Sequence, residues 1–125
     1  MLRKLAFVNL YTKNSNKLIK FYKEVVGLKV LPDNESNWFG FDTGNTKFAI
    51  EPQSNRKSYK FKFNDKNPIL IQFRFKSLNE LRKATKELEK NKVIIKQKLL
   101  KKSYGTVTTF LDPDNNVIEF LFDGN

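Results

Sequence analysis

The chain has 125 residues, which is enough for one domain with a packed core, and it contains neither Cys nor His. These two absences exclude disulfides, thiolate catalysis, iron–sulfur clusters, a serine-type catalytic triad and any metal site built on histidine or cysteine. The 24 basic and 13 acidic residues give a net charge of +11. No apolar run approaches the roughly 20 residues of a membrane span, and the N-terminus lacks a signal-peptide pattern. We therefore expect a cytoplasmic protein with no membrane partner.

The excess positive charge lies in the middle of the chain. Residues 52–102 hold sixteen basic and four acidic residues, whereas the remainder holds eight basic and nine acidic residues. Such a cluster is typical either of a lysine-rich surface in contact with water or of a protein that binds an anionic partner, such as nucleic acid or an acidic small molecule. Twenty of the basic residues are Lys, which is a poorer bidentate partner for phosphate than Arg. Because no helix-turn-helix or RNA-recognition motif accompanies the charge, nucleic acid is disfavoured, and acidic polymers are kept as a secondary hypothesis.

The first half of the chain predicts a strand, a helix and three further strands. Residues 4–12 (KLAFVNLYT) form a strand with one apolar face. Asn14-Ser15 is a candidate helix start, and Gly27 is a natural helix end. The three strands that follow are expected at residues 29–31, 38–43 and 46–51. Gly44-Asn45 indicates a tight hairpin between the last two.

A polar and basic segment, residues 52–67, connects the two halves. Phe61 and Phe63 alternate with Lys60 and Lys62, which predicts a short exposed strand within this segment. Residues 60–66 are interpreted either as a lid over a ligand site or as a loop surrounded by water.

The second half repeats the order of the first. The sequence ILIQFRF at residues 69–75 alternates as a strand does, and Ser77 with Glu80 forms a capping box at the start of a helix. The apolar stripe of that helix consists of Leu78, Leu81, Ala84 and Leu88. Three strands follow at residues 93–99, 106–111 and 117–122, with a turn at residues 112–116. Two strand–helix–strand–strand–strand modules, with helices on one side of a mostly antiparallel sheet, predict an α+β fold.

Three segments of the sequence resemble the motifs of one superfamily. Residues 7–30 resemble its first strand and helix, including a Phe-Tyr pair at Phe21-Tyr22 and a Val-Gly end. Residues 71–93 resemble its second strand and helix. Residues 110–120 (FLDPDNNVIEF) resemble its Asp-Pro-Asp-Gly-Asn…Ile-Glu signature, with Asn115 in place of Gly. The superfamily that these motifs resemble is the vicinal oxygen chelate superfamily, which contains glyoxalases, bleomycin-resistance proteins and extradiol dioxygenases.

The resemblance implies a fold and an assembly. It implies one glyoxalase/bleomycin-resistance-like domain over residues 1–125, with one βαβββ module at about residues 4–52 and a second at about residues 68–123. In this superfamily the two modules form a cupped mixed sheet with the helices on its outer face. Many members are homodimers, so we expect a homodimer here.

The resemblance also assigns the four positions at which metal-using members of the superfamily hold a divalent ion. In this chain they are Phe7, Glu51, Leu70 and Glu119. Phe and Leu side chains offer no lone pairs, so we expect no metal cofactor; Mg²⁺, Mn²⁺, Ni²⁺ or Zn²⁺ held by the two carboxylates is the alternative. Extradiol dioxygenation needs two His ligands on iron and is excluded.

These observations predict a protein that binds a small organic molecule, anionic or aromatic, in the cup without a metal ion. Strand alternation places Gln72 and Arg74 in the cup with Leu70, because the opposite register would bury Arg74 under the helix. The strong positive charge disfavours a cationic ligand such as bleomycin. The expected ligand-contacting residues are Phe7, Asn9, Tyr11, Trp38, Gln72 and Arg74.

Each of these assignments has an alternative. The three aromatic side chains form either a clamp for a flat ligand or ordinary packing. Glu51 and Glu119 are the catalytic carboxylates of a lactoylglutathione-lyase-like lyase or isomerase, or partners of an ion pair with Arg74, or inherited carboxylates without a function. The sequence leaves these alternatives open.

Overall fold

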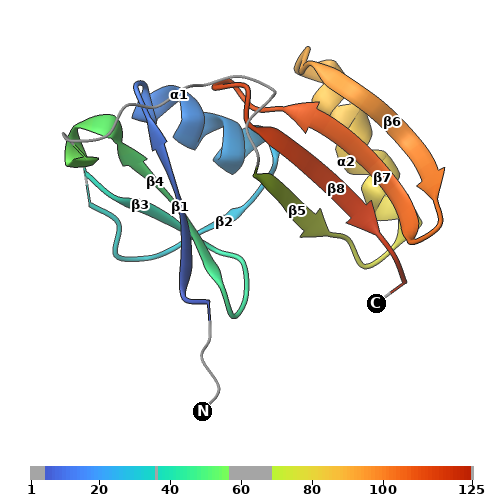
Figure 1. Cartoon of the computed structure of the whole chain (residues 1–125), viewed down its shortest axis with the longest axis horizontal. Helices are drawn as coiled ribbons and strands as arrows, with labels where there is room; N and C mark the ends of the chain where they lie inside the picture. The colour runs from blue at the N-terminus through green and yellow to red at the C-terminus, as the bar shows by residue number, and fades with distance from the viewer. Residues whose placement is uncertain (1–4, 36, 57–68, 125) are drawn as a thin grey trace. The chain divides into compact units, whose positions relative to one another are not determined.

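The structure is a computed structural model that describes residues 5–35, 37–56 and 69–124. The chain divides into two compact units, Met1–Phe61 and Lys62–Asn125, and each contains a strand, then a helix, then three strands (Figure 1). The strand and the lid or loop expected at residues 60–66 lie outside the described residues. Within the described ranges, no helix is long and apolar enough to cross a membrane.

The first unit is a four-stranded sheet with one helical segment. Its elements are β1 (Phe7–Thr12), α1 (Ser15–Lys20), the π-helical turn η1 (Phe21–Val25), β2 (Lys29–Val30), β3 (Phe39–Asp42), β4 (Lys47–Pro52) and the 3₁₀ turn η2 (Gln53–Arg56). The strands lie in the order β1-β4-β3-β2, with β1 parallel to β4 and the other neighbours antiparallel. The predicted βαβββ order of the first module is confirmed.

Local signals start and end the helical segment of the first unit. The Asn14 side chain accepts a hydrogen bond from the Lys17 backbone N–H at 3.1 Å and caps α1. The helix continues into η1, and Gly27 then adopts a φ of +81°, in the left-handed region that favours glycine. The buried Tyr22 ring packs on the Phe48 ring with centroids 4.9 Å apart. The helical segment therefore covers the face of the sheet that carries Phe48.

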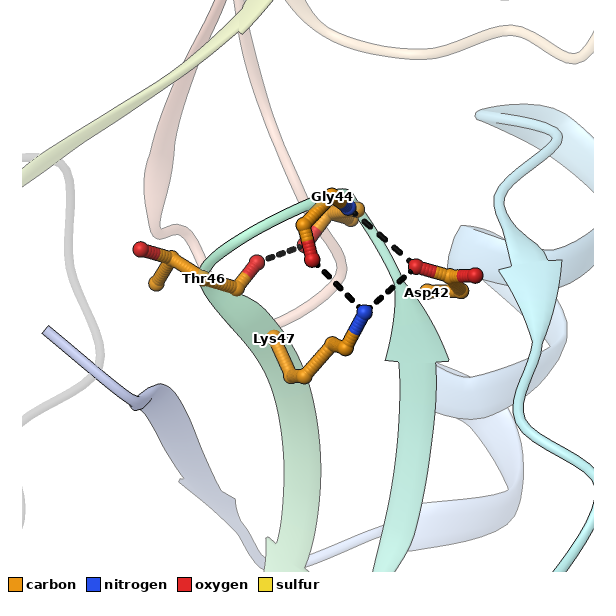
Figure 2. A network of polar contacts seen from close by, with 5 residues as sticks. Asp42, Gly44, Thr46 and Lys47 are labelled. Atoms are coloured by element: carbon orange, nitrogen blue, oxygen red, sulfur yellow. Dashed lines mark hydrogen bonds and ion pairs between the residues drawn. The ribbon is translucent and has the colours of Figure 1, made fainter. Parts of the chain in front are cut away.

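Figure 2 shows the polar contacts that close the hairpin between β3 and β4. Asp42 Oδ1 accepts hydrogen bonds from Lys47 Nζ at 2.7 Å and from the Gly44 N–H at 3.2 Å. Lys47 also donates to the Gly44 carbonyl at 2.6 Å, and the Thr43 hydroxyl donates to the Thr46 carbonyl at 2.5 Å. The Lys47 hydrogen bond is the main cause that holds the pKa of Asp42 below its ordinary value of 3.8. The hairpin predicted from the sequence is confirmed.

The second unit repeats this architecture. Its elements are β5 (Leu70–Arg74), α2 (Leu78–Lys90), β6 (Ile95–Lys102), β7 (Gly105–Leu111) and β8 (Val117–Phe122). The strands lie in the order β5-β8-β7-β6, again with the first pair parallel and the others antiparallel. The α+β class and the two βαβββ modules are thus confirmed, although β6 begins two residues later and ends three residues later than predicted.

The helix of the second unit packs on one face of its sheet. The Ser77 side chain accepts a hydrogen bond from the Glu80 backbone N–H at 3.1 Å, which confirms the predicted N-cap. Leu81 and Leu88 are fully buried, as the apolar stripe predicts. Thr85 is also fully buried, whereas Leu78 and Ala84 of the predicted stripe are only half-buried.

The turn between β7 and β8 explains the Asp-Pro-Asp signature. Asp112 Oδ1 accepts hydrogen bonds from the backbone N–H groups of Asp114 and Asn116, each at 2.9 Å. Between them, Asn115 adopts a φ of +63°. Asn tolerates this left-handed conformation better than most residues, so it replaces the usual Gly at modest cost.

Candidate functional site

The face of the first sheet opposite α1 carries several of the predicted site residues. Phe7, Asn9 and Tyr11 alternate along β1, and the register pairs Tyr11 with Glu51 of β4. Glu51 lies three positions from Phe48 and therefore on the opposite face of the sheet. Since the helical segment covers the Phe48 face, these four side chains share the opposite face of the sheet.

Trp38, Asn9 and Phe7 form a cluster on this face, termed here the Trp38 cluster. The Trp38 indole Nε1–H donates to Asn9 Oδ1 at 3.1 Å. The Phe7 ring meets the indole edge to face, with ring centroids 5.6 Å apart and an interplanar angle of 80°. Phe7 is 46% exposed, Asn9 is exposed and Trp38 is half-buried. The cluster therefore presents aromatic surface to solvent, and a hydrogen bond fixes the orientation of its indole.

Gly40 allows the indole to lie close against the sheet. A Cβ atom at this position would stand 2.5 Å from Trp38 Cη2 and 2.7 Å from Leu31 Cδ1, closer than side chains approach. In the register of the sheet Gly40 pairs with Ala49 and Ala49 pairs with Asn9, so the row that ends at Asn9 contains two small residues. Gly40 was not among the predicted site residues; its signal in the sequence is a glycine inside a predicted strand, which often marks a close approach.

One amide group connects Glu51 to the segment that carries Trp38. Asn55 Nδ2 donates to Glu51 Oε1 at 3.0 Å and to the carbonyl of Asn37 at 2.8 Å. Asn37 directly precedes Trp38, so the carboxylate lies near the Trp38 cluster. The half-buried Tyr11 is its register neighbour on β1. Asn55 could not be found from the sequence, because only the turn η2 brings it back to Glu51.

In the second unit, Glu119 is a buried carboxylate held by hydrogen bonds on the face opposite α2. Glu119 is 4% exposed, and it accepts hydrogen bonds from Gln72 Nε2 at 2.8 Å and from Thr109 Oγ1 at 2.9 Å. Both partners are its register neighbours, on β5 and β7. The Tyr104 hydroxyl lies 3.5 Å from Glu119 Oε1. These hydrogen bonds replace the hydrogen bonds to water that the carboxylate loses on burial. The shared face of Gln72 and Glu119 is confirmed, whereas Thr109 and Tyr104 were missed.

Arg74 forms an ion pair within the second unit. Its Nε and Nη2 atoms donate to the two carboxylate oxygens of Asp123, each at 3.1 Å. The alternative in which Arg74 pairs with Glu119 is therefore not observed. Because Asp123 occupies the guanidinium fork, the side chain is less suited to clamp an anionic ligand than the sequence indicated.

The residues at the four family metal positions do not fit a divalent ion. Phe7 and Leu70 offer no lone pairs. Both oxygens of Glu119 accept hydrogen bonds from side chains of its own sheet. Within the described part of this chain, which lacks His and Cys altogether, no three acidic side chains are grouped so that they could hold a metal. The donor set therefore does not suit metal-dependent chemistry.

Both the sequence and the fold are similar to known proteins. The Glyoxalase/Bleomycin resistance protein/Dioxygenase superfamily model matches residues 4–120. None of the curated proteins matches the chain in sequence.

Solved structures resemble the chain over nearly its whole length. A glyoxalase/bleomycin resistance protein/dioxygenase family enzyme from Burkholderia phytofirmans PsJN has a TM-score of 0.81 and 17% identity, covering 97% of this chain and 99% of that chain. A protein of unknown function from Agrobacterium tumefaciens str. C58 has a TM-score of 0.80 and 20% identity, covering 98% and 95%. Lactoylglutathione lyase from Agrobacterium tumefaciens has a TM-score of 0.74 and 14% identity, covering 97% and 94%. At these identities the likeness shows the fold alone.

Proposed function

We propose that this chain, which belongs to the Glyoxalase/Bleomycin resistance protein/Dioxygenase superfamily, binds a small aromatic molecule at the Trp38 cluster without a metal ion. The observation that carries this proposal is the indole of Trp38, which is fixed by Asn9 and flanked by the exposed Phe7. The sequence alone left both an anionic and an aromatic ligand open, and its net positive charge suited an anionic one. Arg74 is paired with Asp123, and the carboxylate of Glu51 lies near the Trp38 cluster, so these charged groups favour an aromatic ligand over an anionic one.

The geometry of the Trp38 cluster suits a flat ligand. An aromatic ring pair contributes about 0.5–1.5 kcal/mol beyond the burial of its area. The hydrogen bond to Asn9 holds the indole in one orientation before the ligand arrives, so less side-chain entropy is lost on binding. A ligand ring that packs on the indole would also meet the exposed edge of Phe7. The first unit thus provides a preorganised aromatic surface.

The charged groups near the Trp38 cluster favour a ligand with a hydrogen-bond donor. Glu51 shares this face and is connected to the Trp38 segment through Asn55. A carboxylate has about four acceptor sites, of which Asn55 uses one, so Glu51 can accept a further bond from a hydroxyl or N–H group. An anionic group at the same place would be repelled. We therefore propose a neutral aromatic ligand that carries a hydroxyl or N–H group.

The proposal of metal independence rests on the donor atoms. Two of the four family metal positions are hydrocarbon side chains, Phe7 and Leu70, and both Glu119 oxygens are engaged by Gln72 and Thr109. The alternative, a lyase or isomerase that uses Glu51 and Glu119, would need these carboxylates to accept and return a substrate proton. The hydrogen bonds to Glu119 instead support a structural role for it within the second unit.

Nuclear magnetic resonance tests this proposal through a single signal. Trp38 is the only Trp of the chain, so its indole N–H gives one resonance. We expect 2-naphthol, added to chelator-treated protein, to shift that resonance saturably, and 2-naphthoate to bind at least about threefold more weakly because of repulsion by Glu51. Phe7→Ala should weaken 2-naphthol binding about two- to tenfold, since it removes one aromatic contact.

The control is Ile94→Ala, which shortens an exposed apolar side chain in the other unit and should leave the 2-naphthol affinity unchanged. Equal weakening by Phe7→Ala and Ile94→Ala would contradict the proposal, because it would point to general apolar adhesion. Turnover by chelator-treated protein that forms lactoylglutathione and is lost in Glu119→Gln would establish the enzymatic alternative instead.

A further inference from the structure

A groove in the second unit lies between α2 and β6 and belongs to neither the Trp38 cluster nor the Glu119 hydrogen bonds. Its volume is about 340 Å³, within the range of small-molecule pockets. Its lining residues are Asn79, Arg82, Lys83, Thr85, Lys86, Glu89, Lys98 and Leu99. All of them belong to α2 or β6, so one unit of the chain builds the whole groove.

The groove is strongly basic. Four of its side chains are cationic and one is a carboxylate, which leaves a charge of 4 − 1 = +3. Arg82 and Lys86 are one helical turn apart and therefore lie on the same side of α2. Within the described residues, neither they nor Lys83 form an ion pair or a side-chain hydrogen bond. The single carboxylate, Glu89, accepts from Lys98 across the groove at 3.1 Å. Three cations are thus available to a ligand.

The floor of the groove is an irregular strand held by buried hydroxyl groups. The pairing of β6 with β7 shifts register between Gln97 and Leu100, and Leu99 adopts a φ of +47°. A bulky residue is rarely found in this conformation unless its surroundings impose it. The Leu99 N–H donates to Thr108 Oγ1 at 3.1 Å, and Thr108 Oγ1 lies 2.9 Å from Thr85 Oγ1 of α2. Hydrogen bonds through Thr108 therefore connect α2 to the bulged strand β6. Bulges of this kind are common beside binding sites.

We infer that this groove binds a compact oligophosphate, meaning two or three consecutive phosphate groups. The guanidinium of Arg82 can hold phosphate oxygens in a bidentate manner, and Lys83 and Lys86 add point charges beside it. Among the residues that the structure describes, no aromatic side chain lines the groove, so these residues provide no stacking surface of the kind that holds single-stranded nucleic acids. The phosphate chain itself is thus the recognised group. A free polyphosphate and the phosphate chain of a nucleotide share this chemistry.

Calorimetry with inorganic tripolyphosphate tests the inference, with orthophosphate, ATP and a thymidine oligonucleotide as comparison ligands. We expect tripolyphosphate to bind more tightly than orthophosphate, and its affinity to fall as salt is added. Arg82→Gln with Lys86→Gln should weaken tripolyphosphate binding at least about fivefold. The matched control, Lys17→Gln with Lys20→Gln on α1, removes the same charge from the other unit and should change the affinity less than about twofold.

A gain-of-affinity variant keeps the test independent of folding defects. Glu89→Gln removes the carboxylate that competes for Lys98, and it should tighten tripolyphosphate binding about two- to fivefold. Glu24→Gln removes an exposed carboxylate of another lysine pair in the first unit and should leave the affinity unchanged.

The comparison ligands separate the outcomes. Equal affinities of ATP and tripolyphosphate, or tighter binding of ATP, both support the inference and identify the phosphate chain or the nucleotide as the source. An equal loss of tripolyphosphate affinity in the Arg82/Lys86 and the Lys17/Lys20 double variants would overturn the inference, because net charge would then explain the binding. Binding of the oligonucleotide without binding of tripolyphosphate would also overturn it and point to a nucleic acid.

Discussion

Gly40 lies so close to Trp38 that no residue with a Cβ atom fits at position 40 unless the indole moves. A Cβ atom there would overlap the indole, so Gly40→Ala must displace Trp38 from the sheet. We expect Gly40→Ala to lower the free energy of unfolding by about 1–3 kcal/mol, the usual range for overpacking. Urea denaturation measures this loss, and the indole N–H resonance should shift at the same time.

The Trp38→Ala background provides the control for Gly40. Without the indole, the same Gly40→Ala change should cost less, because only the contact with Leu31 remains too close. An equal cost in both backgrounds would contradict the account, since the loss would then come from the strand and not from the indole.

Asp42 gives the stability of the β3–β4 hairpin a predictable pH dependence. Its pKa in the folded protein is lowered from 3.8, chiefly by the hydrogen bond from Lys47. A lowered carboxyl pKa stabilises the folded state above the unfolded-state value, and this stabilisation is lost as the pH falls through the folded-state value. Thermal unfolding should therefore show Asp42→Asn to be less stable than the parent protein at about pH 6, with the difference shrinking as the pH falls below 3.8.

Asp33→Asn is the matched control for Asp42, because it removes a carboxylate of the same unit outside the hairpin contacts. Its melting temperature should follow that of the parent protein at both pH values. A deficit of Asp42→Asn that is as large in acid as at neutral pH would show that the amide, and not the lost charge, is responsible.

At the scale of elements, two threonine hydroxyls connect α2 to β6 and β7. Thr108→Val removes the acceptor of the Leu99 N–H and also the partner of Thr85. Thr85→Val removes only the Thr85 hydroxyl, which donates to the Leu81 carbonyl and lies 2.9 Å from Thr108 Oγ1. Because Thr108→Val leaves the half-buried Leu99 N–H unpaired, and an unpaired donor shielded from water costs about 1–3 kcal/mol, Thr108→Val should destabilise the protein more than Thr85→Val in urea denaturation. The reverse order would contradict the proposed support of the bulged strand.

The same elements show which features the sequence could predict. Ser77 as N-cap, Gly44 in a hairpin and Asp112 in a turn act on neighbours within a few residues, so the sequence predicted them correctly. The face of Gln72 and Arg74 was also predictable, because the alternative register would bury a guanidinium group under the helix. The bulge at Leu99 and the burial of Thr85 were not, because they depend on a hydroxyl contact between residues 23 positions apart.

The sequence predicted only part of the candidate site, because some of its contacts leave no pattern in the sequence. Phe7, Asn9 and Trp38 were proposed together as ligand contacts, and they do lie in one cluster. Gly40 and Asn55 were missed, since a glycine shows no chemistry in a sequence and an asparagine in a turn has no fixed partner. Arg74 was expected to face an anion, but the sequence did not reveal that Asp123 would occupy its guanidinium.

At the scale of the whole molecule, the chain consists of two units with the same strand order but different surfaces. The first presents an aromatic cluster beside a carboxylate, and the second presents a basic groove. Four of the sixteen basic residues between positions 52 and 102 line that groove. Part of the clustered charge of the sequence thus lies in this groove, in the unit that does not carry the Trp38 cluster.

The claim of metal independence gives a further prediction for the whole molecule. Chelator-treated protein titrated with Zn²⁺ or Ni²⁺ should show no stoichiometric, saturable heat, because Phe7 and Leu70 supply no donor atoms. Glu119→Gln should leave this result unchanged. A one-to-one site that disappears in Glu119→Gln would show that the carboxylates hold a metal after all.

The most direct test of the central claim is the dissociation constant of 2-naphthol, read from the indole N–H resonance of Trp38 in chelator-treated protein and again with excess Zn²⁺. We expect saturable binding in both samples, with dissociation constants that agree within about twofold because no metal ion takes part. Saturable binding that appears only with Zn²⁺, or none in either sample, would show that the Trp38 cluster is not a metal-independent binding site.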